Sequence, residues 1–130
     1  MSSLKNILIN ADDYCLSDAI NKAVVKLAKH GLINSVSVLI NNPSVNYQYE
    51  IGKLNNVKIG LHLNLSEGKP LCKQKLVSSL VNSKGEFYSL PFFWLRYMFG
   101  LIKKEHISLE IDAQYAKLAS VNITRSCRFS

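Results

Sequence analysis

Two adjacent carboxylates near the start of the chain, Asp12 and Asp13, are of the residue type that binds metals and transfers protons. The apolar residues 4–10 precede them and predict a strand, and a run with helical spacing begins at Ser17. In parallel α/β folds, ligands and catalytic groups collect at the carboxyl ends of strands. If the strand continues through the pair, the two side chains point in opposite directions, so that one could bind a metal and the other handle a proton. The alternative interpretation is a polar turn between strand and helix.

A single imidazole could complete this chemistry. Residues 58–65 predict a third strand, in which Gly60, His62 and Asn64 share one face. The other face is apolar and carries Ile59, Leu61, Leu63 and Leu65. The alternative for His62 is a core histidine bonded to a backbone carbonyl. If the sheet twists toward a barrel, His62 and the Asp pair converge at one end and form a carboxylate and imidazole set suited to a divalent metal.

The elements that position these residues alternate between strand and helix. The expected order is strand 4–10, helix 17–29, strand 36–40, a weaker helix 45–54 and strand 58–65. The helix 17–29 has Ser17 as its N-cap and Gly31 where a left-handed residue ends a helix. Ile7, Leu8 and Ile9 form a continuous apolar run, which is typical of a strand covered on both faces. The β-α-β-α-β order predicts an α/β fold with a parallel sheet and covering helices.

The second half of the chain predicts two more helices. Residues 91–102 are apolar, and we expect a buried or groove-lining helix there. It carries Phe92, Phe93, Trp94, Tyr97 and Phe99. These rings could form a sugar-stacking platform or pack beneath a loop. Residues 108–120 predict a last helix capped by Ser108. Residues 121–130 form a tail with no clear period.

Composition limits the classes of function. The 130 residues are 48% hydrophobic, which is enough for one small domain with a core. The N-terminus lacks the apolar segment of a secretory signal, and the apolar run 91–102 is interrupted by Arg96 and too short to span a bilayer. Cys15, Cys72 and Cys127 form neither a metal-like pair nor an even disulfide set, which suits a reducing compartment. We therefore expect a cytoplasmic protein without a membrane partner.

The net charge of +7 raises the question of a nucleic-acid partner. The lysines occur singly, with Lys103 and Lys104 as the only adjacent pair, and no basic run alternates with aromatic residues. We therefore expect no nucleic-acid partner.

Four groups of short motifs occur in a fixed order along the chain. They are Asn-Ala-Asp-Asp-Tyr at 10–14 with Leu16 and Ser17; His-Gly at 30–31 with Ser-Val-Ser at 35–37 and Asn-Asn-Pro at 41–43; Gly-Leu-His-Leu-Asn-Leu-Ser-Glu-Gly-Lys-Pro-Leu at 60–71; and Ser-Leu-Val at 79–81 with Lys-Gly-Glu-Phe at 84–87. Together they resemble the YdjC-like carbohydrate deacetylases, the family of chitooligosaccharide deacetylases. A weaker similarity follows at Glu110, Ile111, Ala113 and Gln114. The resemblance covers most of residues 4–118, which is the first half of a family domain.

The resemblance implies a fold, a reaction and roles for individual residues. The fold is a (β/α) barrel of the deacetylase type, present here as a truncated N-terminal half. The reaction is hydrolytic removal of an N-acetyl group from an acetylated oligosaccharide such as a chitooligosaccharide. By position, Asp13 and His62 look like metal ligands, Asp12 looks like the base, and Asn64 and Glu67 are assigned to substrate binding. The resemblance suggests magnesium, and the ligand chemistry also permits zinc.

The chain departs from the family pattern in two ways. Cys15 stands where the family usually has glycine, which tightens the turn if that position needs a positive φ. The family also supplies another metal ligand from a His-x-Asp-Ser-His-type motif, and neither His30, at a helix end, nor His106, before the last helix, replaces it. Because catalytic metals usually have three protein ligands, we expect weak metal binding and weak or absent activity.

The missing half suggests three further hypotheses. Residues 1–120 are the N-terminal part of a deacetylase domain, and residues 121–130 are an off-pattern tail: codons for 125–130 exist whose frame, read one nucleotide later, encodes the missing histidine motif. A frameshift would explain the truncation. An open half-barrel exposes strand edges, so a homo-oligomer is an expected form. The alternative function is that of a noncatalytic remnant that binds a sugar or a partner protein through the aromatic residues 92–99.

Overall fold

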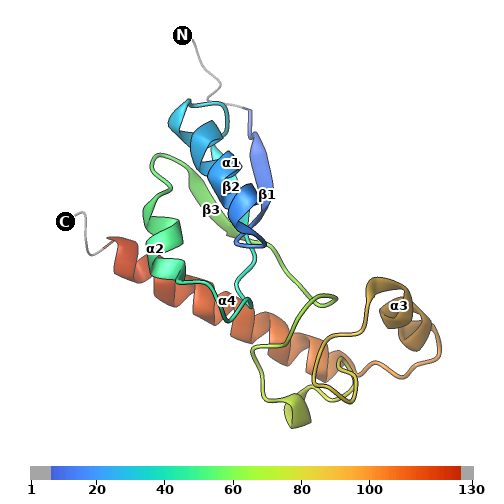
Figure 1. The fold of residues 1–130 in the computed structure, drawn as a ribbon. Helices are drawn as coiled ribbons and strands as arrows, with labels where there is room; N and C mark the ends of the chain where they lie inside the picture. The colour runs from blue at the N-terminus through green and yellow to red at the C-terminus, as the bar shows by residue number, and fades with distance from the viewer. Residues whose placement is uncertain (1–6, 127–130) are drawn as a thin grey trace.

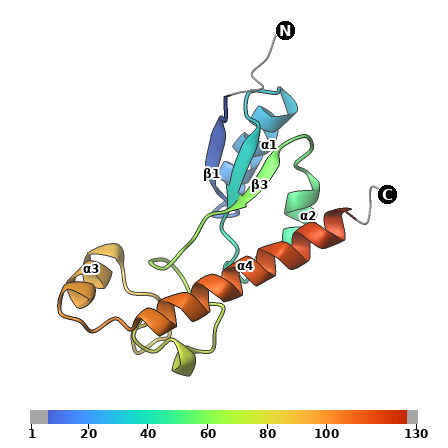
Figure 2. The same ribbon diagram turned by 180° about the vertical axis from the view of Figure 1, so that it is seen from behind.

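Three parallel strands organise the computed structural model, which describes the backbone of residues 7–126 and the side chains of residues 7–122. The strands lie in the order β1, β2, β3, with β2 in the centre. Helix α1 covers one face of the sheet (Figure 1), and from behind the strands lie in front of it (Figure 2). The bounds are β1 Asn10–Tyr14, α1 Asp18–Lys29, β2 Ser35–Val38, α2 Tyr47–Gly52 and β3 Lys58–Leu61. The predicted β-α-β-α-β order is therefore confirmed, as an α/β fold with a three-stranded parallel sheet.

Helix α1 begins and ends at the residues that the sequence predicts. The Ser17 side chain accepts a hydrogen bond from the Ile20 N–H at 3.4 Å, which satisfies one of the free amides of the first turn. At the other end His30 is the C-cap and Gly31 has a φ of +67°. The Leu32 N–H returns to the Leu27 carbonyl at 3.0 Å, which closes the helix end.

The main core lies between the sheet and its helices. Val36 and Val38 of β2 are fully buried there. Ile59 and Leu61 of β3 pack against this core, while Gly60 pairs in register with Ser37 on the alternate position. The predicted division of the third strand into an apolar and a polar face is therefore correct for residues 59–61.

The strand boundaries differ from the prediction. β1 begins at Asn10, so the Asp pair lies within the strand rather than after residues 4–10, of which 4–6 fall outside the described residues. Ile7 and Leu8 are 56% and 64% exposed, so the expectation of a strand covered on both faces is wrong there. The physical reason is that both residues precede β1 and so lie outside the sheet whose faces the core and the helices cover. β3 ends at Leu61, four residues early, because the chain then turns toward α4.

Helix α4 (Lys104–Ser126) is longer than expected. It runs beneath the carboxyl ends of the strands and contacts α2 and β3 (Figures 1 and 2). It starts four residues before Ser108, which lies inside the helix and is not its cap. The helix also continues through the first part of the predicted tail, whose last residues, 127–130 with Cys127, lie outside the described residues.

Helix α3 (Leu90–Met98) stands away from the sheet, near the amino-terminal end of α4, and the 3-10 turn η2 (Gln74–Leu76) precedes it in the chain (Figure 1). Nearby, Val77, Leu80, Val81, Phe87 and Ile102 form a second, smaller core. Phe93 packs against this cluster, but no residue of α3 is fully buried, and Phe99 just after it is 72% exposed. The expectation of a buried helix is therefore wrong for residues 91–98, because Phe93 meets the small core while most of its neighbours are exposed. Ile102, after the helix, is buried in that core, and the alternative of a groove-lining helix stays a prediction. Among the described residues, no helix is long and apolar enough to cross a membrane.

Candidate active site

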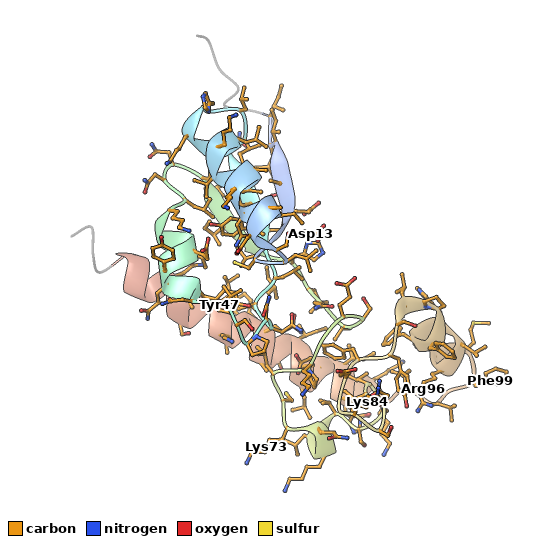
Figure 3. The ribbon with its side chains drawn as sticks, viewed as in Figure 1. Asp13, Tyr47, Lys73, Lys84, Arg96 and Phe99 are labelled. Atoms are coloured by element: carbon orange, nitrogen blue, oxygen red, sulfur yellow. The ribbon has the colours of Figure 1, made fainter. Side chains whose placement is uncertain are left out.

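Asp12, Asp13 and His62 meet at the carboxyl end of the sheet. His62 Nδ1 lies 3.5 Å from Asp13 Oδ1 and 3.8 Å from Asp12 Oδ1. The Asp13 N–H also donates to His62 Nδ1 at 3.4 Å. The structure thus brings together the three side chains that the sequence selected, and Figure 3 shows Asp13 at the end of β1. Their chemical roles stay predictions.

An irregularity in β1 brings the carboxylates of Asp12 and Asp13 close to the His62 imidazole. The register with β2 shifts between Ala11 and Tyr14, and Asp13 and Cys15 have φ values of +62° and +76°. The expected alternation of Asp12 and Asp13 therefore does not hold. A left-handed conformation costs a non-glycine residue about 1–2 kcal/mol, so this turn requires compensation. Cys15 occupies the position where a positive φ makes glycine the natural residue.

Three hydrogen bonds hold the irregular turn. The Cys15 N–H donates to Asn21 Oδ1 of α1 at 2.7 Å, the Tyr14 hydroxyl donates to Glu50 of α2 at 3.0 Å, and the Leu39 N–H donates to the Tyr14 carbonyl at 2.9 Å. Burial, followed by the bond to Glu50, raises the pKa of Tyr14 far above its usual value. Burial raises the pKa of the Cys15 thiol to about 12, so this thiol is not a nucleophile near neutral pH.

Asn10 is a site residue for which the sequence analysis assigned no role. Its side-chain amide donates to Asp12 Oδ1 and to Ser37 Oγ, both at 2.8 Å. Positions 10 and 12 share one face of β1, and alternation alone could have revealed this contact. Asn21 was also missed. The sequence could have indicated Asn21, because it is a polar residue three positions before the buried Val24 and so lies on the side of α1 that faces the sheet.

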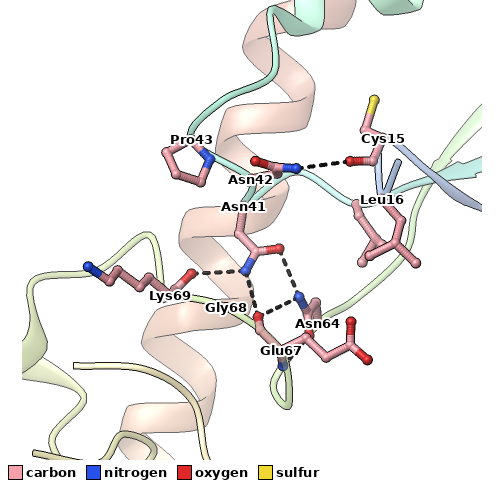
Figure 4. Close-up of a pocket in the computed structure, with 10 residues that line it drawn as sticks. Cys15, Leu16, Asn41, Asn42, Pro43, Asn64, Glu67, Gly68 and Lys69 are labelled. Atoms are coloured by element: carbon pink, nitrogen blue, oxygen red, sulfur yellow. Dashed lines mark hydrogen bonds between the residues drawn. The ribbon is translucent and has the colours of Figure 1, made fainter. Parts of the chain in front are cut away.

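A pocket of about 260 Å³ adjoins the strand ends (Figure 4). It is lined by Cys15, Leu16, Leu39, Asn41, Asn42, Pro43, Asn64, Glu67, Gly68 and Lys69. The side chain of Asn64 donates to Asn41 Oδ1 and to the Glu67 carbonyl, and its Oδ1 accepts from the Ser66 and Glu67 amides. Since these four bonds fill the capacity of an amide, Asn64 shapes the loop, while the exposed Glu67 lines the pocket. Substrate binding by either residue stays a prediction.

The donor set fits two ligands of one divalent ion. Two ligand atoms on a shared ion at typical distances lie about 3.4 Å apart, which is close to the observed separation of Asp13 and His62. His62 Nδ1 accepts a long hydrogen bond from the Asp13 amide and lies within 3.8 Å of an oxygen of each carboxylate, a grouping of electron-rich atoms that a cation would stabilise. Among the described residues, no group of three or more His, Cys, Asp or Glu side chains is arranged to hold a metal ion. The set is therefore compatible with a metal but incomplete.

A parallel α/β sheet with carboxylates and an imidazole at its carboxyl edge is the arrangement found in α/β enzymes. The family model described as YdjC-like protein matches residues 6–125, and the chain therefore belongs to this family.

Similar proteins agree with this assignment. The carbohydrate deacetylase of Thermoanaerobacter pseudethanolicus is 31% identical over 123 residues, which are 93% of this chain and 47% of that protein. The chitooligosaccharide deacetylase of Yersinia enterocolitica is 30% identical over 118 residues, or 90% and 45%. A crystal structure from Enterococcus faecalis, of a protein named for a supposed cellobiose-phosphate cleavage activity, superposes with a TM-score of 0.76 and 25% identity over 88% of this chain and 44% of that one. The chain spans about half the length of the curated relatives it matches.

Proposed function

We propose that this chain supplies the N-terminal part of a metal-dependent hydrolase that removes N-acetyl groups from acetylated carbohydrates such as chitooligosaccharides. The observation that carries the proposal is the convergence of Asp12 and Asp13 on His62. Relatives named as carbohydrate and chitooligosaccharide deacetylases support the reaction class.

The roles follow from amide hydrolysis. Asp13 and His62 would hold the divalent ion, with magnesium preferred and zinc as the alternative. A bound ion supplies polarisation of the acetyl carbonyl and acidifies a water molecule. Asp12, oriented by Asn10, accepts the proton of the attacking water. As the carbon–nitrogen bond breaks, the sugar amine takes up a proton and acetate is released.

We further propose that the sheet is the first part of a (β/α) barrel, with residues 1–120 as the N-terminal portion of the domain. The chain then supplies two metal ligands and lacks the third, and the chain alone has weak or no activity. Sequencing the coding DNA tests the frameshift hypothesis for residues 125–130, because a downstream frame without the histidine motif refutes it. A cytoplasmic location and self-association belong to the same proposal.

The test measures acetate release from diacetylchitobiose with added Mg²⁺ or Zn²⁺, alongside ion binding by calorimetry. We expect Asp13→Asn to weaken ion binding, and Asp12→Asn to keep ion binding while reducing the weak acetate release of the parent chain. The exposed Asp112 of α4 provides a matched control, since Asp112→Asn makes the same chemical change away from the site. Equal effects of all three substitutions would refute the assignment of roles.

A second candidate function is noncatalytic sugar binding through α3. Phe92 and Trp94 are 61% and 55% exposed, and the Trp94 and Tyr97 rings meet edge to face at 5.9 Å. Exposed aromatic rings are suited to stacking on a sugar. Because Trp94 is the only tryptophan, its fluorescence reports binding directly. A change on adding diacetylchitobiose that persists in a chelator and disappears in Phe92→Ser supports this candidate, and a change that depends on the metal or on protein concentration excludes it.

A further inference from the structure

Two hydrogen bonds hold the turn after β1, one to the N–H and one to the carbonyl of Cys15. Its N–H donates to Asn21 Oδ1 at 2.7 Å, and its carbonyl accepts from Asn42 Nδ2 at 3.4 Å. Cys15 is 1% exposed and Asn21 is 7% exposed, so the shorter bond is shielded from water. A buried amide without its acceptor is strongly unfavourable, and the bond therefore fixes where the Cys15 peptide can lie.

This peptide controls the direction of the Asp pair. The Leu16 N–H closes a turn onto the Asp13 carbonyl at 3.0 Å, so the backbone from 13 to 16 moves as a unit. With Asp13 and Cys15 both at positive φ, relaxation of Cys15 to the extended region would open this turn and rotate the Asp13 carboxylate away from His62.

We propose that Asn21 is a positioning residue for the candidate metal site. It acts through Cys15: its side-chain oxygen holds the left-handed peptide, and the held peptide keeps Asp13 on His62. The inference deepens the proposed function, because it names a residue of α1 that no ligand would touch but on which ion affinity depends.

The competing explanation is that Asn21 is only a satisfied polar group in the core. The two explanations predict different effects of a glycine at position 15. If Asn21 serves to hold a residue in a conformation that only glycine adopts freely, then Cys15→Gly makes Asn21 dispensable for the geometry of the site. If Asn21 matters only for packing, glycine at position 15 does not compensate for its loss.

The experiment combines Asn21→Ala, Asn21→Asp, Cys15→Gly and the double variant Asn21→Ala/Cys15→Gly. Val24→Ala is the control, since it removes buried volume from the same helix and the same core but leaves the hydrogen bond between Asn21 and the turn in place. We measure Zn²⁺ and Mg²⁺ affinity by calorimetry at equal folded fraction, and the amide resonances of Asp13 and His62 by NMR.

We expect Asn21→Ala to weaken ion affinity by about 10-fold or more, the range typical of partners that orient a metal ligand. Asn21→Asp keeps the acceptor oxygen and should stay within about 3-fold of the parent, and the double variant should match Cys15→Gly alone. Equal losses in Asn21→Ala and Val24→Ala, or a double variant as weak as Asn21→Ala, would overturn the proposal.

The NMR readout separates this inference from the proposed function. If the parent chain binds neither ion, the metal assignment fails, but the Asp13 and His62 resonances still report the geometry. The positioning role then requires that Asn21→Ala shifts both resonances more than Val24→Ala does, and that glycine at position 15 restores them. Unchanged resonances in Asn21→Ala would refute it.

Discussion

A buried carboxylate on α4 anchors the loop that follows β3. Glu110 is fully buried, and its two oxygens accept hydrogen bonds from the Leu71 and Cys72 amides at 2.9 and 3.0 Å. One turn later Gln114 donates to the Glu110 carboxylate at 2.9 Å and to the Asn64 carbonyl at 2.7 Å. The loop of residues 64–72 therefore depends on one face of a helix, and we expect Glu110 to be among the most sensitive positions in the chain.

The magnitude follows from these bonds. A hydrogen bond to a charged group contributes about 1.5–3 kcal/mol. Glu110→Ala leaves two backbone amides without an acceptor and should lower the free energy of unfolding by about 3–5 kcal/mol. That is a large part of the total of about 5–15 kcal/mol for a domain. Glu110→Gln keeps one acceptor oxygen but turns an amide group toward the Cys72 N–H, and should cost about 1–3 kcal/mol.

Urea unfolding followed by circular dichroism measures these losses, and hydrogen exchange shows whether the Leu71 and Cys72 amides lose protection first. Glu105, exposed in the first turn of the same helix, is the matched control: Glu105→Gln makes the same charge change and should stay within about 0.5 kcal/mol of the parent. The reasoning is refuted if Glu110→Gln and Glu105→Gln unfold at the same urea concentration.

Three further outcomes are expected. The pKa of Cys15 lies near 12 in the folded protein against 9.0 unperturbed, so the folded state keeps a proton that the unfolded state loses, and stability that is present below pH 9.0 falls as the pH rises. Between about pH 9 and 10 the parent should therefore lose about 1 kcal/mol more than Cys15→Ala, measured by urea unfolding. Gly31→Ala should cost about 1 kcal/mol because its φ is +67°, whereas Gly52→Ala, equally free of steric contact but without a positive φ, should stabilise by about 0.5 kcal/mol; equal thermal midpoints would contradict this. Phe99→Ser should leave the unfolding midpoint within about 0.5 kcal/mol of the parent, since 72% of Phe99 is exposed, and a larger loss would show that the ring is covered in solution.

Local patterns in the sequence predicted the parts of the fold that local chemistry determines. Ser17 and Gly31 marked the ends of α1 because caps act within one turn of the backbone. The alternation in β3 placed Ile59 and Leu61 toward the core because side-chain direction in a strand has a fixed period. The approach of His62 to the Asp pair followed from the geometry of parallel strands, which end at a common edge.

The predictions were wrong where tertiary contacts determine the burial or the start of a helix. The apolar run 91–102 has the composition of a buried helix, but burial requires a surface to pack against, and within the run only Phe93 and Ile102 meet the second core. The early start of α4 reflects a distant contact, because the Lys103 N–H donates to Ser79 Oγ at 3.0 Å and the His106 ring bonds the same hydroxyl at 2.9 Å. Ser108 has a side chain suited to an N-cap, but it lies inside α4 and not at the start of the helix.

The conformation of the Asp pair depends both on the local strand pattern and on tertiary contacts, and the tertiary contacts decide where its carboxylates point. In a regular strand, Asp12 would share the polar face with Asn10 while Asp13 pointed into the core beside α1, where an unpaired carboxylate is strongly unfavourable. The register shift and the left-handed Asp13 avoid that burial and turn the second carboxylate toward His62. The conformational cost falls on Asp13 and Cys15, and the hydrogen bonds from α1, α2 and the residue after β2 offset it. Because a chain released from those contacts would return to regular alternation, the two carboxylates stay beside His62 only while both helices remain packed on the sheet.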